Sequence, residues 1–408
     1  MTVTNAEETV RRRIALLHYS AEPALGGVEK LIQAQVEALL SLGYQVRLVV
    51  GSGVQPTGAE LCTIEAMHPD HPSVLAGGRD LLIDASLQSH PVTGSLSREI
   101  GLALEDCTDC WVHNALTVTL NPFLTMALAQ LVLKTPLIRW VAWCEDLSAT
   151  SAYVAKSDLT DEAAIHDALR ATRLVTISNH RAAELRRTLG IASTAVRVIR
   201  PPLNIASWLG LADQTTDLAG QLHLHRFVPS VLVPAKMLPH KDLFRALDLV
   251  DGLVVRGCTP LVLFTGALSV HQPDLSRLVL DDLIHEVLGR GLEPWVRIAT
   301  DMTGVALFPQ TVRELMMLTD LVFLASREEG FGMPLVEAAA VRAPVLCSDI
   351  PAFREVLGDA ARYVPSDATE VELAGAAVEI AASSWNRTRR DALGSMDLFS
   401  ADLRSLLE

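Results

Sequence analysis

The sequence predicts an α/β protein made of two doubly wound, Rossmann-like domains with a cleft between them. Short apolar runs that suit buried strands alternate with helix-like segments along nearly the whole chain, which is typical of parallel sheets covered by helices. A polar stretch near the middle, 204–225, interrupts this alternation, which then restarts. The 408 residues are also too many for one ordinary core, because domains of roughly 200 residues are the expected size.

The chain therefore divides into three predicted parts. We expect one Rossmann-like domain over 1–205 and a second over 206–385. The stretch 204–225 is polar and poor in structural signals, so it is the expected linker. A helical segment over 386–408 follows the second domain, and its periodicity leaves open whether it packs back on the first domain.

The first half opens with a βαβ unit. "RIALLHYS", from Arg13, is an apolar run that predicts a buried strand, and the glycine turn "ALGGVEK" follows it. The pattern over 28–43 predicts a helix with Gly43 as its C-cap, and "YQVRLVV" predicts the next strand. Further strands are predicted at "CWVHN", "TPLIRWVAW", "RLVTIS" and "AVRVIRPPL".

The second half repeats the architecture. Strands are predicted at "FVPSVLVPAK", "PLVLFTG", "WVRIAT", "LVFLAS" and "APVLCSD", with helical patterns between them. In open sheets of this kind, ligands bind outside the carboxyl ends of the strands. Candidate binding residues are therefore sought in the loops that follow these runs.

Composition excludes several classes of protein. The net charge of −14 argues against nucleic acid as a partner. The compact basic run Arg11–Arg13 is interpreted as a solvated strand start rather than a lipid anchor, so peripheral membrane contact has no support in the sequence. No apolar stretch of about 18 residues predicts a membrane span, and the first residues lack a secretion-signal pattern. We therefore expect a cytoplasmic protein.

The cysteines predict neither disulfides nor a metal site. In the cytoplasm the six cysteines are expected to be reduced thiols. Cys107 and Cys110 form a CxxC pair, but no second pair or histidines at ligand spacing accompany them. The pairs His68/His71 and His223/His225 are equally weak as metal ligands, so no metal is expected.

The stretch "SREEGFGMPLVEAAA", Ser326–Ala340, carries the strongest chemical signal. It follows the buried strand "LVFLAS", where binding loops collect. Gly330 and Gly332 let the backbone approach a ligand closely, and Pro334 suits the first position of a helix. The free amides of that helix start form an anion site, worth roughly 0.3–1 kcal/mol when exposed.

Two carboxylates flank this anion site. Glu329 precedes the loop, and Glu337 lies about one turn into the helix. Carboxylates accept hydrogen bonds from paired hydroxyls, so a nucleoside diphosphate sugar would fit, with hydroxyls at both ends and phosphates on the amides. The helix dipole alone also favours glutamates near a helix start, so spacing by itself leaves a structural interpretation open.

These motifs resemble those of a known family. "REEGFGMPLVEAA" is similar to the E-x7-E signature of the retaining glycosyltransferases of family four, which have the GT-B fold. "APVLCSDIPAFREV" and "VPAKMLPHKD" extend the resemblance in the second half, and "ALGGVEK" resembles the family's glycine loop. The resemblance covers nearly the whole chain, and it implies a first domain that binds acceptor and a second that binds nucleotide sugar.

The resemblance implies a role for each matching residue of the second domain. Glu329, Lys241 and Lys236 would be catalytic: Glu329 would hold the donor sugar, and the lysines would neutralise the diphosphate leaving group. Glu337 would bind the ribose. The remaining donor-binding residues would be Gly330, Phe331, Gly332, Met333, Pro334 and Gly266.

In the first domain, the resemblance implies an acceptor and phosphate loop. Gly26 and Gly27 would let the backbone approach the reacting phosphate and the acceptor. His113 follows a predicted strand and is a candidate sugar contact, against a structural or merely exposed histidine. Glu145, in "WCEDLS", stands where similar members have a histidine, which puts acceptor handling in doubt.

Two more positions depart from the family pattern. Lys236 stands where an arginine is commoner, so a point charge replaces a bidentate fork. Arg342 stands where the family has glycine in "AxGxPV", which removes an easy left-handed turn.

The function implied is a retaining, metal-independent hexosyl transfer, with the leaving phosphate taking the acceptor's proton on the same face. No cofactor is required; the donor would be a UDP- or GDP-linked sugar, and the acceptor a glycan, a glycolipid or a small polar molecule. Two alternatives stay open. One is a sugar-nucleotide isomerase resembling a 2-epimerase, and the other is a non-catalytic subunit that binds nucleotide sugar.

Overall fold

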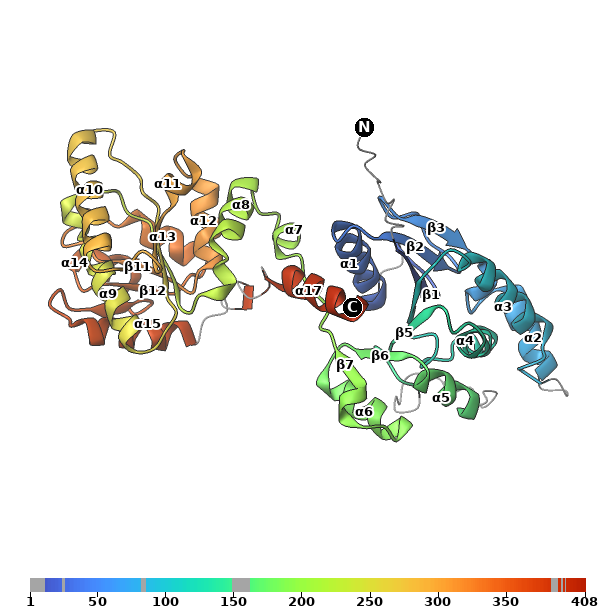
Figure 1. Ribbon diagram of the computed structural model, residues 1–408. Coiled ribbons are helices and arrows are strands. Elements are labelled where there is room, and N and C mark those ends of the chain that lie inside the picture. The colour runs from blue at the N-terminus through green and yellow to red at the C-terminus, as the bar shows by residue number, and fades with distance from the viewer. Residues whose placement is uncertain are drawn as a thin grey trace, which may run out of the picture. The chain divides into compact units, whose positions relative to one another are not determined.

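A computed structural model describes residues 12–23, 26–81, 86–148, 162–382, 388–389, 392 and 394–408 (Figure 1). The chain splits into two compact units. Unit 1 comprises Met1–Pro202 and Asp397–Glu408, and unit 2 comprises Leu203–Met396. Each unit is an α/β layer structure around its own parallel sheet, which confirms the predicted α/β class with two Rossmann-like sheets.

Unit 1 is built on a seven-stranded sheet in the order β3-β2-β1-β4-β5-β6-β7, and every pairing is parallel. Its strands are β1 (Arg13–His18), β2 (Gln45–Val50), β3 (Glu60–Thr63), β4 (Asp109–His113), β5 (Arg139–Trp143), β6 (Arg173–Thr176) and β7 (Val196–Val198). Its helices are α1 (Gly27–Ser41), α2 (Pro72–Leu81), α3 (Pro91–Ala103), α4 (Pro122–Lys134), α5 (Glu162–Arg170), α6 (Asn179–Leu189) and α17 (Ser395–Leu407).

Helices cover both faces of this sheet. One face packs against α3, α4, α5 and α6, and the other against α1 and α17. The strands are therefore apolar on both sides, as their continuous hydrophobic runs predict. Side chains alternate along each strand, so Leu16, Trp111 and Trp143 share the face beneath α1 and α17.

Unit 2 is built on a six-stranded parallel sheet in the order β10-β9-β8-β11-β12-β13. Its strands are β8 (Ser230–Val233), β9 (Leu261–Phe264), β10 (Val296–Ile298), β11 (Leu321–Leu324), β12 (Val345–Ser348) and β13 (Arg362–Val364). Its helices are α7 (Ile205–Leu209), α8 (Asp213–Leu222), α9 (Phe244–Val255), α10 (Pro273–Gly289), α11 (Ala299–Thr303), α12 (Pro309–Leu318), α13 (Met333–Ala340), α14 (Pro351–Leu357) and α15 (Glu370–Ala382).

The predicted linker is wrong in one respect, because 204–225 is mostly helical. It forms α7 and α8, and α8 contributes Leu218 and Leu222 to the core of unit 2. The buried carboxylate of Glu314 in α12 accepts hydrogen bonds from the Thr215 hydroxyl (2.6 Å) and the Ala212 amide (2.9 Å). These contacts hold the polar segment against the core of unit 2. The low hydrophobicity of the segment gave no sign of this packing, because the contacts are polar.

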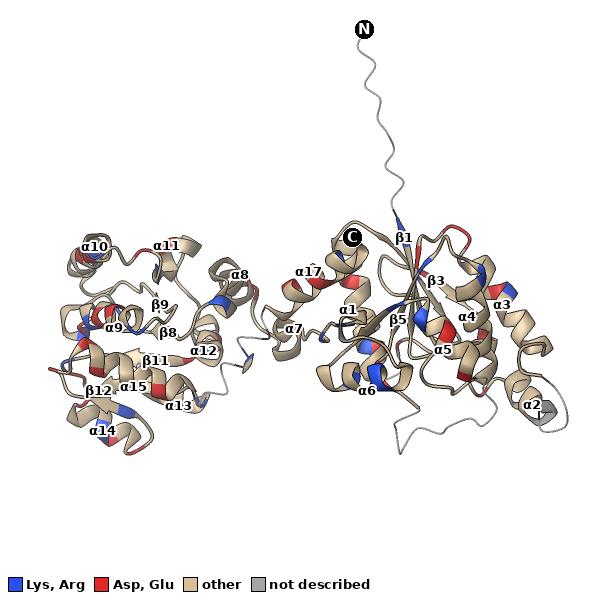
Figure 2. Cartoon of the chain, turned by 60° about the horizontal axis from the view of Figure 1, so that its bottom comes forward, with Lys and Arg blue, Asp and Glu red and all other residues tan. Residues whose placement is uncertain are grey.

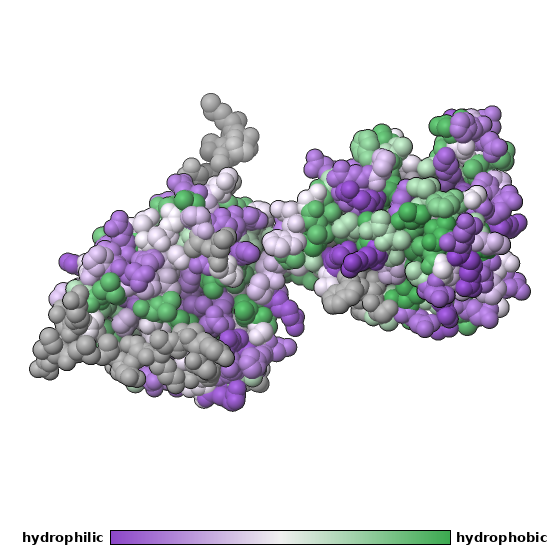
Figure 3. Space-filling view, turned by 180° about the vertical axis from the view of Figure 1, so that it is seen from behind, coloured by the Kyte–Doolittle hydropathy of each residue, from purple (hydrophilic) through white to green (hydrophobic). Residues whose placement is uncertain are grey.

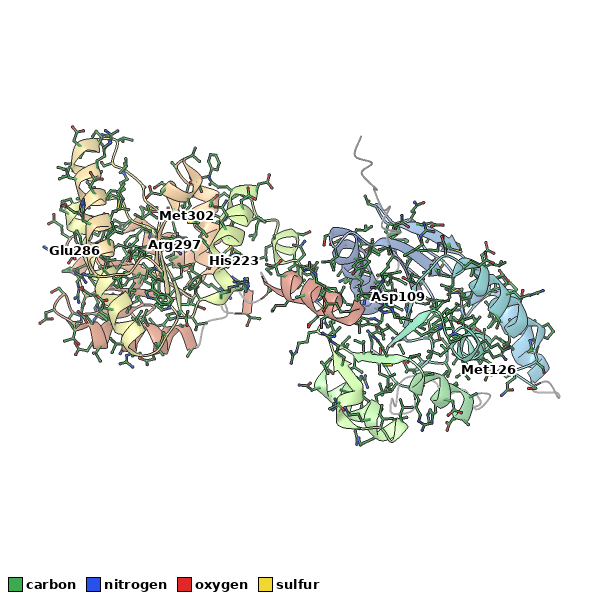
Figure 4. All side chains as sticks on the ribbon, viewed as in Figure 1. Asp109, Met126, His223, Glu286, Arg297 and Met302 are labelled. Carbon is green, nitrogen blue, oxygen red and sulfur yellow. The ribbon has the colours of Figure 1, made fainter. Side chains whose placement is uncertain are left out.

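Helix α17 brings the end of the chain into unit 1. Phe399 and Leu403 are buried in the same core as α1. The guanidinium groups of Arg12 and Arg139 donate to the Leu407 carbonyl (3.1 and 2.9 Å), so they cap the C-terminal end of the helix. Both arginines also pair with the buried carboxylate of Asp109 (3.1 and 2.8 Å), which is labelled in Figure 4.

The surface carries mixed charge. Basic and acidic residues are interspersed over the helices of both units, as Figure 2 shows. Apolar surface areas are broken up by polar residues in the view of Figure 3. Among the described residues, no helix is both long and apolar enough to cross a membrane. All six cysteines are free thiols.

Candidate active site

The topology of unit 2 places its binding crevice between β8 and β11. The strand order reverses direction there, and ligands of doubly wound sheets bind at such a switch point, outside the carboxyl ends of the strands. The segment after β8 carries Lys236 and Lys241, and the segment after β11 carries Glu329. The sheet therefore brings together three residues that lie up to 93 positions apart in the sequence.

A pocket of about 630 Å³ opens at this edge. Its size lies within the range of roughly 300–1,000 Å³ that is usual for small-molecule sites. Its lining includes most of the predicted donor-side residues: Lys236, Lys241, Glu329, Phe331, Gly332, Met333, Pro334 and Glu337. Thr265, Ala267 and Thr300 also line it. Gly266 and Gly330 are not part of this lining.

An ion pair lies in the wall of the pocket. The Lys241 ammonium lies 2.5 Å from Glu329 Oε1, and both side chains are mostly buried. The hydroxyl of Ser326, which is fully buried, donates to the same oxygen at 2.8 Å. Glu329 is thus held in one orientation from two sides.

The two loops are also tied to each other through their backbones. The Arg327 amide donates to the carbonyl of His240 at 2.8 Å. The Arg327 guanidinium forms a two-bonded pair with the carboxylate of Asp242 (2.9 and 3.1 Å). This tie fixes the spacing between the lysine-bearing and glutamate-bearing loops.

Helix α13 begins at the pocket. It starts at Met333, one residue earlier than predicted, so Pro334 takes the second position. Proline is tolerated there for the same reason as at the first, since an amide in the first turn has no intrahelical partner. Glu337 lies further along the helix, is solvent-exposed and lines the pocket.

Gly332 has a structural reason to be glycine. It is the N-cap of α13 with a φ of 91°, in the left-handed region. A Cβ there would lie 2.9 Å from a ring carbon of Phe353, so any other residue would be strained and crowded. Gly330 has open space around it, and a side chain at Gly266 (φ 75°) would meet the Thr300 hydroxyl.

The predicted loss of a left-handed turn at Arg342 is wrong. Arg342 itself adopts this conformation, with a φ of 57°. The turn is a Schellman motif: the Ala343 amide donates to the Ala338 carbonyl (2.9 Å), and the Arg342 amide donates to the Ala339 carbonyl (3.0 Å). The helix end keeps its geometry, and the arginine bears the backbone strain.

Unit 1 has its own switch point, between β1 and β4. His18 ends β1, His113 ends β4, and Glu145 follows β5. His113 Nδ1 lies 2.7 Å from Glu145 Oε1, and both side chains are buried. The structure therefore joins two residues that the sequence suggested separately.

His18 completes this buried group. Its Nδ1 lies 3.0 Å from the His113 carbonyl, which can only accept, so Nδ1 carries a proton. Burial, reinforced by the nearby His113 ring, lowers the pKa of His18 to about 4. Neutral His18 then turns an unprotonated Nε2 toward Glu29, whose Oε1 is 3.9 Å away.

The glycine loop of unit 1 leads into the start of α1. Gly26 is the N-cap and Gly27 the first helical residue. The Glu29 carboxylate lies over Gly26, because a Cβ at Gly26 would meet Glu29 Oε2 at 2.0 Å. The Ser20 hydroxyl donates to Glu29 at 3.0 Å. Ala24 and Leu25 of this loop lie outside the described residues.

Sequence reasoning missed several of these groups. Ser326 and Asp242 carry no signal of their own, because a serine after a strand is common and the aspartate acts through a long-range pair. His18 was visible at the end of a strand, at the same position relative to its strand as His113. That parallel placement is the signal that could have found it. Among the described residues, no group of three His, Cys, Asp or Glu side chains is arranged to hold a metal ion.

Comparison with known proteins finds matches to glycosyltransferases. The family model for glycosyl transferases group 1 matches residues 299–391, which contain the loop after β11 and α13. A stretch of 55 residues is 42% identical to the serotype-specific mannosyltransferase WbdA of Escherichia coli, and it covers 14% of this chain and 7% of that protein. A stretch of 42 residues is 55% identical to the O-antigen chain mannosyltransferase RfbU of Salmonella typhimurium, and it covers 10% of this chain and 12% of that protein.

Among solved structures, the chain is similar to a glycosyltransferase from Rickettsia africae. The similarity has 15% identity and a TM-score of 0.36, and it covers 97% of this chain and 98% of that one.

Proposed function

We propose that the protein is a glycosyltransferase that moves a sugar from a nucleoside diphosphate sugar to an acceptor hydroxyl, with retention at the anomeric carbon. The observation that carries the proposal is the pocket of unit 2. It brings two lysines, the start of α13 and two carboxylates together around one space. The match of residues 299–391 to the family model supports the same activity.

The charged groups of the pocket match the sugar, the diphosphate and the ribose of such a donor. Lys236 and Lys241 supply positive charge for a diphosphate, together with the amide end of α13. Each charge-assisted hydrogen bond of this kind contributes about 1.5–3 kcal/mol. Glu329 receives sugar hydroxyls, and Glu337 receives the hydroxyls of the ribose.

The chemistry we propose needs no metal. The lysines and the helix amides stabilise the negative charge that develops on the leaving diphosphate. That phosphate then accepts the proton of the attacking hydroxyl on the same face of the sugar. Because attack occurs on the same face with the help of the leaving phosphate, Glu329 forms no covalent bond in this proposal. It acts by position and charge, and Lys241 and Ser326 hold it in place.

Replacing Glu337 tests the ribose assignment. In Glu337→Ala, the donor dissociation constant should rise by about 5- to 150-fold, which corresponds to the ~1–3 kcal/mol of lost ribose contacts. Isothermal titration with UDP-, GDP- and ADP-sugars measures this change. Mannosyl donors come first in the screen, because the curated relatives WbdA and RfbU are mannosyltransferases.

Glu328→Ala is the matched control for this experiment. Glu328 is an exposed glutamate one position before Glu329, and it is not part of the pocket lining. It removes the same charge from the same loop, so donor affinity should stay within about twofold of the wild type on the usual scale of surface substitutions. Equal affinities of the wild type and Glu337→Ala would contradict the ribose assignment.

The two alternatives differ in their products. A sugar-nucleotide isomerase would convert the donor into its epimer without an acceptor, and a non-catalytic subunit would bind it without turnover. Proton NMR of a donor incubated with the protein distinguishes epimer, free sugar plus nucleotide, and unchanged donor. Slow release of free sugar, with the anomeric configuration retained, is the outcome that our proposal expects.

A further inference from the structure

The buried pair of His113 and Glu145 has a fixed proton arrangement. A carboxylate oxygen only accepts hydrogen bonds, so the 2.7 Å contact between Glu145 Oε1 and His113 Nδ1 requires the proton on Nδ1. His113 is fully buried and Glu145 is 4% exposed, so water does not compete for this contact. The other ring nitrogen, Nε2, is then a bare lone pair in the neutral ring.

The surroundings hold both partners in place. Asn114 turns with a φ of 55°, and its side-chain oxygen accepts hydrogen bonds from the amides of Glu145 and Asp146, each at 3.0 Å. His18 donates to the carbonyl of His113 from the other side. The Trp143 ring stacks on the His113 ring, with centroids 5.5 Å apart and planes at 20°. The imidazole cannot rotate without breaking this packing.

The outer atoms of the pair are left without partners. His113 Nε2 and Glu145 Oε2 are buried and make no hydrogen bond within the described part of the chain. Each unpaired buried polar atom destabilises the folded protein by about 1–3 kcal/mol. A purely structural role for the pair does not explain why two such atoms are present. The pair also lies at the carboxyl ends of β4 and β5, beside the switch point of unit 1.

We propose that Glu145 is a positioning residue that holds His113 in its Nδ1–H form, so that His113 Nε2 accepts a hydrogen bond from a substrate hydroxyl. This inference rests on the proposed function, and it assigns Glu145 a role that acts through the histidine. It also narrows the ligand class. A lone pair on Nε2, with the Glu145 carboxylate on the same ring, receives O–H donors and repels a phosphate or carboxylate at the same place.

The tautomer can be measured without any substrate. Long-range proton–nitrogen correlation spectra of the full chain, labelled with nitrogen-15 in its 12 histidines, distinguish Nδ1–H from Nε2–H rings. His113→Gln identifies the His113 signals by their loss. We expect the wild type to show His113 as Nδ1–H. Glu145→Ala should lose that pattern in favour of the Nε2–H form, which free histidine prefers.

Two further variants keep the test decisive. Glu145→Leu also lacks an acceptor but fills the volume, so it replaces Glu145→Ala if the alanine variant does not fold. Asp146→Ala is the control, because Asp146 is the adjacent carboxylate and pairs with Arg181 at 2.9 Å instead. It should leave the His113 tautomer unchanged. An Nε2–H ring in the wild type, or an unchanged ring in Glu145→Leu, would overturn the proposal.

Activity gives the second readout. Glu145→Leu should lower kcat/KM for transfer by about 10- to 100-fold, as loss of a partner that orients a functional histidine does. It should cause no further loss in a His113→Gln background, whereas independent roles would add. Donor affinity in unit 2 is measured alongside. If the wild type binds no nucleotide sugar, the proposed function fails, while the tautomer spectra still decide the role of Glu145.

Discussion

Arg342 bears a strained backbone at the end of α13. Placing a non-glycine residue in the left-handed region destabilises the folded protein by roughly 1–2 kcal/mol. Glycine would remove this strain, but its greater conformational freedom in the unfolded chain would offset part of the gain. Arg342→Gly should therefore raise the free energy of unfolding by about 1 kcal/mol, measured by urea denaturation. Gly43 is the mirror control, because it closes α1 with the same Schellman motif at a φ of 87°. Gly43→Ala should lower stability by a similar amount, and a change of the same sign in both variants would contradict this account.

His18 makes stability depend on pH. Its pKa falls from 6.5 to about 4 on folding, so between these values the unfolded chain binds a proton that the folded protein does not. Stability from this group is complete above pH 6.5 and is lost as the pH falls toward 4, by about 3 kcal/mol at most. His18→Gln should flatten this part of the pH profile of urea unfolding. A variant profile as steep as that of the wild type would assign the pH dependence to other groups.

Helix α17, the last element of the chain, is expected to contribute to the stability of unit 1. Leu403 is fully buried against the sheet, whereas Leu398 on the same helix is 64% exposed. Leu403→Ala should lower the free energy of unfolding by about 2–5 kcal/mol, because it removes a buried side chain and leaves a cavity. Leu398→Ala, the matched control, should change it by less than ~0.5 kcal/mol. Equal effects would mean that α17 is not part of the folded core.

The same scale shows which elements sequence patterns could reveal. The strands β1, β4, β8 and β11 were predictable because burial on both faces leaves a continuous hydrophobic run. The strands β3 and β13 were not, because few of their side chains are buried and they carry no continuous hydrophobic run. Helix α8 was missed because its polar face is satisfied by Glu314, a contact that joins residues 99 positions apart.

At the scale of the whole molecule, a donor should act on unit 2 first. A ligand at 100 times its dissociation constant stabilises the state that binds it by about 2.7 kcal/mol. Hydrogen exchange should therefore slow in the pocket segments 234–241 and 329–337 when a nucleotide sugar is added. Protection confined to segments of unit 1 would contradict the placement of the donor.

Parts of the candidate site whose residues lie close together in the sequence were predictable, and parts formed by distant residues were not. Glu329, Gly332 and Glu337 lie in one short segment, and the lysines lie in a second, and all five residues line one pocket. The pairing of His113 with Glu145 depends on two strands lying next to each other, which the sequence did not show. Roles that arise from one residue orienting another become visible in the structure alone.

The ion pair between Lys241 and Glu329 affects both the binding of a ligand to the pocket and its release. Under the proposed function, an incoming diphosphate would replace Glu329 as the partner of Lys241, so it would gain less than it would from an unpaired ammonium group. After sugar transfer, the Glu329 carboxylate would pair with Lys241 again, and the nucleotide product would dissociate more easily. Weaker donor binding and faster release of the nucleotide product would then both follow from the same ion pair.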